Sequence, residues 1–374
     1  MPTSSERILA YDRARALAVI GMVFVNSSNM MSMCNIDPVW VDAAIDFICG
    51  RAAVVFVMLA GAGIVLAYDR TPPGAAAAAL RIRLLKRAGW LFVAGIGLMQ
   101  VWEADILHFY AAYFILGVAL LDSSGPRLKK TLSVVTLLAI PVCALLSYGY
   151  EGGEILGNLN DLRTPLSFLS HYFTSNYYPV LPWFGFFLTG MLLGRMERAP
   201  SRARYVRLLA GGLIVCAVIE ILSALLTAES VAGRWVDISD PLWRALTLSE
   251  AFPTNPLFVF SAGACGVALI ALCRLLPERT PPAARPGPLV AFGRLSLTLY
   301  VCHILAGGLY HRWILAHHES VSSTQLLSFA AGYIAIGMVF ATLWTRRYKR
   351  GPLERLMDAL TRVSLKPHGK PLPV

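Results

Sequence analysis

The chain has 374 residues, of which 56% are hydrophobic and only 15% are charged, and its formal net charge is +11. Soluble domains carry about 25% charged residues, and disordered chains carry few apolar ones. The composition therefore excludes a disordered chain and argues against a soluble enzyme or a nucleic-acid-binding protein. It predicts a polytopic membrane protein of the all-α class.

Apolar stretches that can cross a bilayer, for which a helix needs about 20 residues, recur along the whole sequence. They lie near residues 13–32, 52–69, 88–102, 106–122, 131–148, 180–195, 205–227, 253–275, 288–310 and 325–345. The third and sixth stretches are short. We predict a bundle of about ten transmembrane helices.

Basic residues are concentrated in alternate connecting segments. With the N-terminus in the cytoplasm, the inner segments hold all 33 Lys and Arg residues except Arg51, Arg163, Arg234, Arg244 and Arg312. Because Lys and Arg accumulate on the cytoplasmic side, both termini are predicted to be cytoplasmic and the protein to lie in the cell membrane. The basic charge is expected to contact anionic membrane lipids and no nucleic acid. Residues 1–350 are predicted to form a single transmembrane domain, and residues 351–374 a basic cytoplasmic tail.

The seven cysteines show no spacing typical of a metal site, so no metal ligands are predicted. Cys34 and Cys49 flank the short segment after the first span. They could form a disulfide if that segment faces an oxidising compartment. The longest predicted outer segments are 149–179 and 228–252, and long loops of this kind are often functional.

The first span carries Asp12, Arg15 and Asn26 on one helical face. Ionisable groups within membrane helices are costly, so the stripe is a candidate lining for a ligand passage. The alternative is an interfacial Asp–Arg pair with an asparagine that joins two helices.

The fourth span begins with Glu103, Asp105 and His108. Asp105 and His108 have i, i+3 spacing, so on a helix the carboxylate could orient the imidazole for general-base chemistry. An interfacial belt of polar and aromatic groups would explain the same residues. His303 is predicted to lie near the middle of the ninth span, where it either lines a wet cavity or bonds to a neighbouring helix.

Several segments resemble a transmembrane acyltransferase superfamily that includes the heparan-α-glucosaminide N-acetyltransferase family, the bacterial DUF418 family and acyltransferase-3 relatives. Asp12 to Asn26 resembles the motif D-x-x-R-G-x-A-x-x-G-x-x-x-x-N at the start of these proteins. Tyr178 to Arg195 is similar to the glucosaminide acetyltransferase pattern Y-P-x-x-P-W-x-G. Three further segments resemble the DUF418 family: Gly50 to Gly63, Asp105 to Ala111 and Gly293 to Tyr300.

This resemblance implies a bundle that takes an acyl group from cytoplasmic acyl-CoA, most simply acetyl-CoA, and delivers it to an extracytoplasmic acceptor, usually a sugar. Asp12, Arg15 and Asn26 match the first motif. Two positions depart from the family. Ala16 replaces a usual glycine, and residues 34–40 lack the histidine that glucosaminide acetyltransferases have after their first span. His108 or His303 then takes that role, or the chemistry differs.

The resemblance and the polar residues together predict an acyltransferase mechanism. Asp12, Arg15, Asn26, Arg83, Lys86 and Arg87 are expected to bind acyl-CoA, and Tyr178, Trp183 and Trp235 to contact a sugar or glycan. His108, oriented by Asp105, is expected to remove the proton of the acceptor, and Asn26 or Arg51 to stabilise the oxyanion. His303 is a second candidate, through a covalent acyl-imidazole.

Two other functions fit the same residues. A transporter for a small or lipid-linked molecule would use the intramembrane polar groups to bind its substrate. A non-enzymatic membrane protein would use the outer segments as an interface. The sequence leaves open the acceptor, the acyl chain length and whether the protein forms a homodimer.

Overall fold

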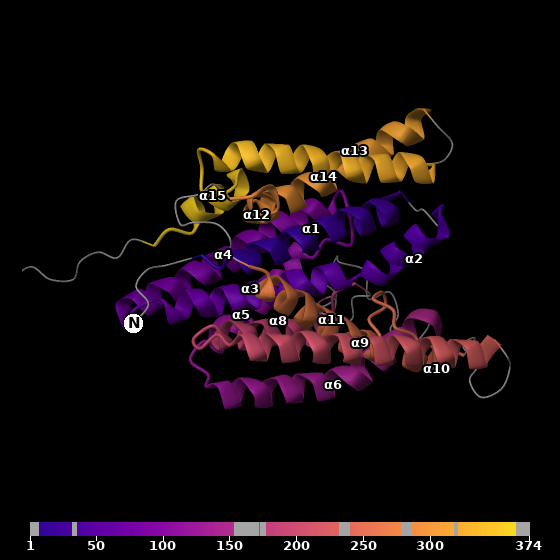
Figure 1. Ribbon diagram of the computed structural model, residues 1–374, viewed down its shortest axis with the longest axis horizontal. Helices are drawn as coiled ribbons and strands as arrows, with labels where there is room; N and C mark the ends of the chain where they lie inside the picture. Colours follow the sequence, from indigo (N-terminus) through magenta and orange to yellow (C-terminus); the bar gives the residue numbers. More distant parts are fainter. Residues whose placement is uncertain are drawn as a thin grey trace, which may run out of the picture.

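The computed structural model describes residues 7–31, 36–152, 172, 177–231, 240–277, 286–317 and 321–363. All regular secondary structure in these ranges is helical, and most helices run along one common direction (Figure 1). The helices are α1 (Leu9–Met30), α2 (Val39–Ile48), α3 (Arg51–Asp69), α4 (Ala75–Met99), α5 (Leu107–Ala119), α6 (Gly125–Gly152), α8 (Val180–Met196), α9 (Arg202–Val231), α10 (Pro241–Thr247), α11 (Pro256–Leu275), α12 (Pro288–Arg294), α13 (Ser296–His317), α14 (Ser323–Thr345) and α15 (Pro352–Leu360).

Each of the ten predicted spans coincides with a helix or, for the ninth, with the pair α12 and α13. Five helical segments of the described residues are long and apolar enough to cross a membrane, or six if α12 and α13 count as one broken span. Helices α5 and α8 are apolar but shorter, and α1 and α4 carry charges near their N-termini. The prediction of ten spans therefore stays a prediction, whereas the all-α class is confirmed.

Three features differ from the predicted elements. Helix α4 begins at Ala75 and not near residue 88, so the basic residues 81–87 lie on a helix and not in a loop. The predicted outer segment after α1 contains the short helix α2. The ninth span is bent by 81° where α12 ends and α13 begins.

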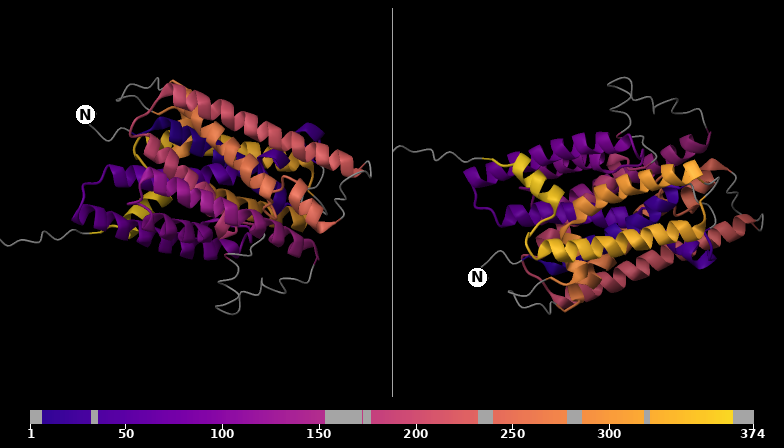
Figure 2. Two further views of the ribbon diagram at one scale, coloured as in Figure 1. Left: turned by 90° about the horizontal axis from the view of Figure 1, so that it is seen from below. Right: turned by 90° about the horizontal axis from the view of Figure 1, so that it is seen from above.

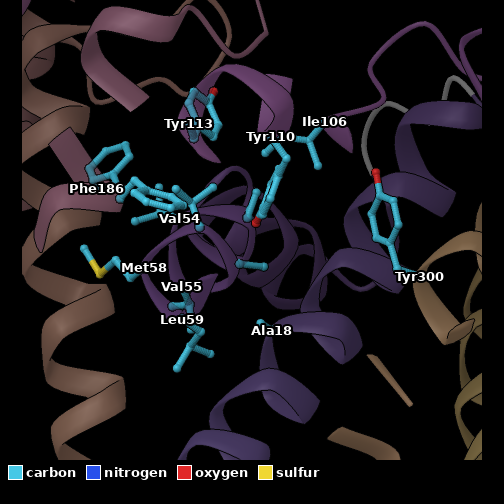
Figure 3. Packing of buried hydrophobic residues seen from close by; sticks show 14 of the residues in the cluster. Ala18, Val54, Val55, Met58, Leu59, Ile106, Tyr110, Tyr113, Phe186 and Tyr300 are labelled. Carbon is cyan, nitrogen blue, oxygen red and sulfur yellow. The ribbon is translucent and has the colours of Figure 1, made fainter. Parts of the chain in front are cut away.

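Glycine contacts join α3 and α8 at the centre of the bundle. A Cβ atom on Gly190 would overlap the carbonyl oxygen of Met58, and one on Gly61 would overlap that of Phe187. Small residues let membrane helices approach closely and pack through their backbones. Buried side chains such as Val54 and Phe186 fill the space around this contact (Figure 3).

The peripheral helices, unlike the central pair α3 and α8, expose large apolar side chains on the surface of the bundle. On α6, α9 and α14, large apolar side chains such as Leu137, Ile214 and Ile336 are exposed. An exposed apolar surface of this extent suits lipid and not water. Together with the apolar helix lengths, it identifies a multi-pass membrane protein.

The predicted inner segments lie at one end of the bundle, here called the basic end. Ion pairs and hydrogen bonds join them there. Asp69, the last residue of α3, pairs with Arg195 and Arg198 at the end of α8. Likewise, Arg81 on α4 pairs with Asp122 after α5. The alternation expected from the distribution of Lys and Arg thus matches the way the helix ends meet.

The C-terminal segment that was predicted as a separate tail begins with a packed helix. On α15, Glu354 Oε1 accepts hydrogen bonds from the backbone N–H groups of Leu297 (2.7 Å) and Thr298 (3.2 Å), in the first turn of α13. A carboxylate at a helix N-terminus complements the helix dipole. This end of α13 is therefore completed by a residue close to the C-terminus of the chain.

Candidate functional site

Asp12, in the first turn of α1, is a buried carboxylate shared by three arginines. Its oxygens accept hydrogen bonds from Arg7 Nε (2.6 Å), Arg7 Nη2 (2.8 Å) and Arg15 Nη1 (2.8 Å). Arg294 Nε lies 3.7 Å away, because Gly293 lets α12 contact the backbone of α1 at Asp12. The predicted Asp12–Arg15 pair is confirmed as a contact, and the structure adds Arg7 and Arg294.

Further arginines surround this pair at the basic end. Arg15, Arg83 and Arg350 all lie within electrostatic range of Arg87, which also stacks over Phe114 at 5.6 Å. We call this group the basic cluster, and among the described residues it has twice as many guanidinium groups as carboxylates. Its members are Arg7, Arg15, Arg83, Arg87, Arg294 and Arg350 with Asp12, Glu354 and Asp358.

Two of the predicted cofactor residues lie toward the outside of this cluster. Arg83 pairs with Asp358 of α15 at 2.7 Å, and the exposed Lys86 reaches the backbone carbonyl of Arg362 at 3.5 Å. Arg350 also pairs with Asp358. The acidic residues of α15 therefore form part of the basic cluster, which the sequence pattern alone did not indicate.

Asp105 and His108 lie deeper in the bundle, and both side chains are fully buried. Asp105 lies two residues before α5 and not on the helix as predicted, and its Oδ2 accepts a hydrogen bond at 2.8 Å from the N–H of Leu107, the first residue of the helix. Its Oδ2 still lies 3.8 Å from His108 Nδ1. Gly95 makes this geometry accessible, since a Cβ there would overlap the backbone nitrogen of His108.

Tyr300, on α13, connects this pair to the second candidate histidine. Its hydroxyl donates to Asp105 Oδ1 at 3.0 Å, and its ring lies 5.1 Å from that of His303. In Figure 3 the hydroxyl end of the Tyr300 side chain points toward the side where Ile106 lies, and Ile106 follows Asp105 in the chain. His303 Nε2 is in turn hydrogen-bonded to the side-chain amide of Asn26 on α1, at 3.0 Å.

These contacts join α1, α5 and α13 in one buried polar network. Its members are Asn26, Asp105, His108, Tyr300 and His303. All three residues predicted as catalytic are thus brought together. The contact of Tyr300 with Asp105 was missed, although Tyr300 ends one of the motifs, because an apolar membrane sequence gives no sign that a tyrosine hydroxyl faces a carboxylate.

The predicted sugar-binding aromatics lie beside the network. Tyr178 is buried with its ring 4.7 Å from Trp183 and 5.9 Å from Phe109, the residue after His108. Trp183 is fully buried, and its indole N–H donates to Thr254 Oγ1 at 3.1 Å. A ring with no exposed surface packs against the protein and has no face free for a ligand. Trp235 and Cys34 lie outside the described residues.

Arg51 belongs to a separate group, called here the Arg51 cluster, with Glu220, Ser249 and Ser261. Its guanidinium pairs with Glu220 and donates to Ser261 Oγ (3.0 Å), Ser249 Oγ (3.3 Å) and the carbonyl of Phe47 (2.7 Å). The structure therefore does not place Arg51 with the polar network.

Comparison with known families agrees with these motifs. The catalytic family of heparan-alpha-glucosaminide N-acetyltransferase matches residues 7–225, which include Asp12, Asn26, His108 and Trp183. A family described as a protein of unknown function, DUF418, matches residues 192–364, which include Tyr300 and His303.

A relative that aligns along nearly the whole given sequence is also found. The uncharacterized protein YxaH of Bacillus subtilis (strain 168) is 23% identical, with 98% of this chain and 97% of the relative covered. The glucosaminide acetyltransferase match alone spans more than half of the chain. The chain therefore belongs to the heparan-alpha-glucosaminide N-acetyltransferase family, within the transmembrane acyltransferase-like superfamily that it shares with DUF418.

Proposed function

We propose that the protein is a membrane-bound acyltransferase that moves an acyl group from acyl-CoA to a sugar or glycan hydroxyl or amine. The acyl group is most simply acetyl. The supporting observation is that α1 links two sites: Asp12 and Arg15 belong to the basic cluster, and Asn26 to the polar network. At 1.5 Å per residue these sites lie about 21 Å apart along α1.

The basic cluster supplies the donor site in this proposal. CoA carries several phosphates, and guanidinium groups bind phosphate oxygens by charge-assisted, often bidentate hydrogen bonds. Arg15 and Arg87 would hold the phosphates, with Arg83 and Lys86 toward the outside. The basic end then lies at the cytoplasmic face of the cell membrane, as the distribution of Lys and Arg predicts.

The polar network supplies the chemistry. His108 removes the proton from the acceptor hydroxyl or amine, which attacks the thioester carbonyl. The new C–O or C–N bond forms as the C–S bond breaks, and the departing CoA thiolate takes the proton from His108. Asp105, fixed by Tyr300 and by Leu107 N, stabilises the protonated imidazole.

His303 has a positioning role in this scheme. Its Nε2 is already engaged by Asn26, so the pair joins α13 to α1, with the ring of His303 packed against that of Tyr300. The Asn26 amide, itself part of the network, would stabilise an oxyanion once the donor is bound. The acceptor would approach from the end opposite the basic cluster, where Tyr172 donates to the backbone carbonyl of His108 at 3.2 Å.

The test is acyl transfer by the purified protein in lipid nanodiscs. Radiolabelled acetyl-CoA is supplied with glucosamine, and both labelled product and released CoA thiol are measured. We expect His108→Ala to lower the rate by about 10²- to 10⁴-fold, the usual contribution of a general base. His311→Ala is the matched control, since His311 lies outside the network on the same helix as His303.

Binding separates the enzyme from a transporter. We expect acetyl-CoA to raise the thermal stability of the wild type and of His108→Ala alike, because the basic cluster is intact in both. If no CoA species binds the wild-type protein, the acyltransferase proposal is wrong.

A further inference from the structure

A cavity of about 340 Å³ lies between four helices, apart from the basic cluster and the polar network. Helix α6 packs on α8, and α9 packs on α11. The cavity lies between these two pairs, and residues of all four helices line it. Figure 1 shows α6 and α9 at one edge of the bundle, and both views of Figure 2 keep α9 at the periphery.

Glycines keep this cavity open. A Cβ atom on Gly211 would have no neighbour within 4 Å, and one on Gly185 or Gly263 would meet only side chains at 3.5 Å or more. The adjacent Gly212 differs, because a Cβ there would press on the backbone of Ala264. Gly212 thus serves the contact between α9 and α11, whereas Gly211 leaves space that no part of the described chain fills.

The lining is apolar along most of its length and cationic at one end. Arg207 lines the cavity near the start of α9, at the basic end, and is exposed. Carboxylates nearby at this end are engaged elsewhere: Glu197 with Arg274, and Asp69 with Arg195 and Arg198. Within the described ranges, Arg207 forms no ion pair. From Arg207 to Val215 the cavity follows α9 for about 12 Å.

We propose that this cavity binds one acyl chain of an anionic phospholipid, with the lipid phosphate on Arg207. An apolar groove on lipid-facing helices accepts a hydrocarbon chain, and a basic side chain at the membrane interface accepts an anionic headgroup. The charge of Arg207 selects an anionic headgroup over a zwitterionic one. This site is independent of the acyl-transfer proposal.

The test uses native mass spectrometry and thermal unfolding of the detergent-purified protein with dioleoyl phosphatidylglycerol or dioleoyl phosphatidylcholine. We expect the wild type to retain phosphatidylglycerol and to be stabilised by it more than by phosphatidylcholine. Arg207→Gln should weaken phosphatidylglycerol binding about ten-fold, and Arg207→Lys should restore part of it.

Filling the cavity is the second arm. Gly211→Leu should displace the chain, whereas Gly332→Leu is the matched control, because Gly332 on α14 also has open space around it but lies away from the cavity. Unfolding without added lipid shows whether each variant is folded. Equal binding of both lipids, or undiminished binding by Gly211→Leu, would overturn the proposal. The proposal would also be overturned if oleoyl-CoA, but not CoA, displaced the lipid. The cavity would then bind the acyl chain of a thioester.

Discussion

Two groups of arginines in the same bundle differ in how their charge is balanced. In the Arg51 cluster, one guanidinium pairs with one carboxylate, two serine hydroxyls and a backbone carbonyl, and the rings of Phe47 and Phe258 cover it. In the basic cluster, Arg7, Arg15 and Arg294 share the single carboxylate of Asp12. A balanced group contributes to packing. We attribute the unbalanced guanidinium groups to the proposed binding of an anion from outside the chain.

Removing the balanced arginine should have the largest effect on stability. Arg51→Met leaves Glu220 without its cation, and breaking such a pair costs about 3–5 kcal/mol when it is buried. Because Glu220 is partly exposed, we expect the lower end of that range, measured by thermal unfolding in detergent. The double variant Arg51→Met, Glu220→Gln should recover part of the loss. If Arg51→Met is stable but has lost the proposed acyl-transfer activity, Arg51 takes part in that reaction and does not serve stability.

Removing an unbalanced arginine should affect binding more than stability. Arg15→Ala takes a guanidinium from the proposed donor site, but Asp12 keeps Arg7 and Arg294 as partners. We expect the affinity for CoA to fall about 10- to 100-fold, the worth of one charged hydrogen bond. Isothermal titration calorimetry measures this. If the affinity for CoA is unchanged and the stability falls strongly, then Arg15, like Arg51, serves stability and not binding.

The outer arginines should have a smaller and salt-dependent effect. The side chains of Arg83 and Arg350 are 42% and 52% exposed, so salt screens their charges. We expect Arg350→Gln to weaken CoA binding about three-fold at low salt and hardly at all at high salt. Comparison of CoA with dephospho-CoA shows whether the lost contact is with the 3′-phosphate. A loss that high salt does not reduce would place Arg350 in the interior of the donor site.

The smallest expected effect is at the junction of α15 with α13. Glu354→Gln keeps the shape of the side chain but removes the charge that complements the N-terminus of α13. We expect a loss of about 1 kcal/mol in the free energy of unfolding. Glu103→Gln is the control, because its carboxylate lies near the opposite end of the bundle. Equal losses in the two variants would mean that the charge does not act on this helix end.

The sequence predicted well what depends on neighbouring residues. Apolar runs located the helices, and the i, i+3 spacing of Asp12 and Arg15 gave their contact. The bend between α12 and α13 was not predictable, because the two helices together read as one apolar span and no proline stands between them. Tyr300 and Asp105 are 195 residues apart, so only tertiary packing brings them together.

Burial explains the remaining differences in the site. Arg51 and Trp183 each looked suited to contact a substrate, because their chemistry is right for it. Whether such a side chain meets a ligand depends on which partners enclose it. Glu220 and Thr254 supply those partners from helices and loops that no local pattern connects to them.

The contact of Glu354 with α13 has a consequence for biosynthesis. The ribosome makes α13, with Tyr300 and His303, well before it makes α15. Until α15 has been made and has left the ribosome, the N-terminus of α13 lacks the carboxylate of Glu354 that completes it. The N-terminus of α13 is therefore completed only after α14 and α15 have been made, and a chain that stops before α15 would insert the earlier helices without this contact.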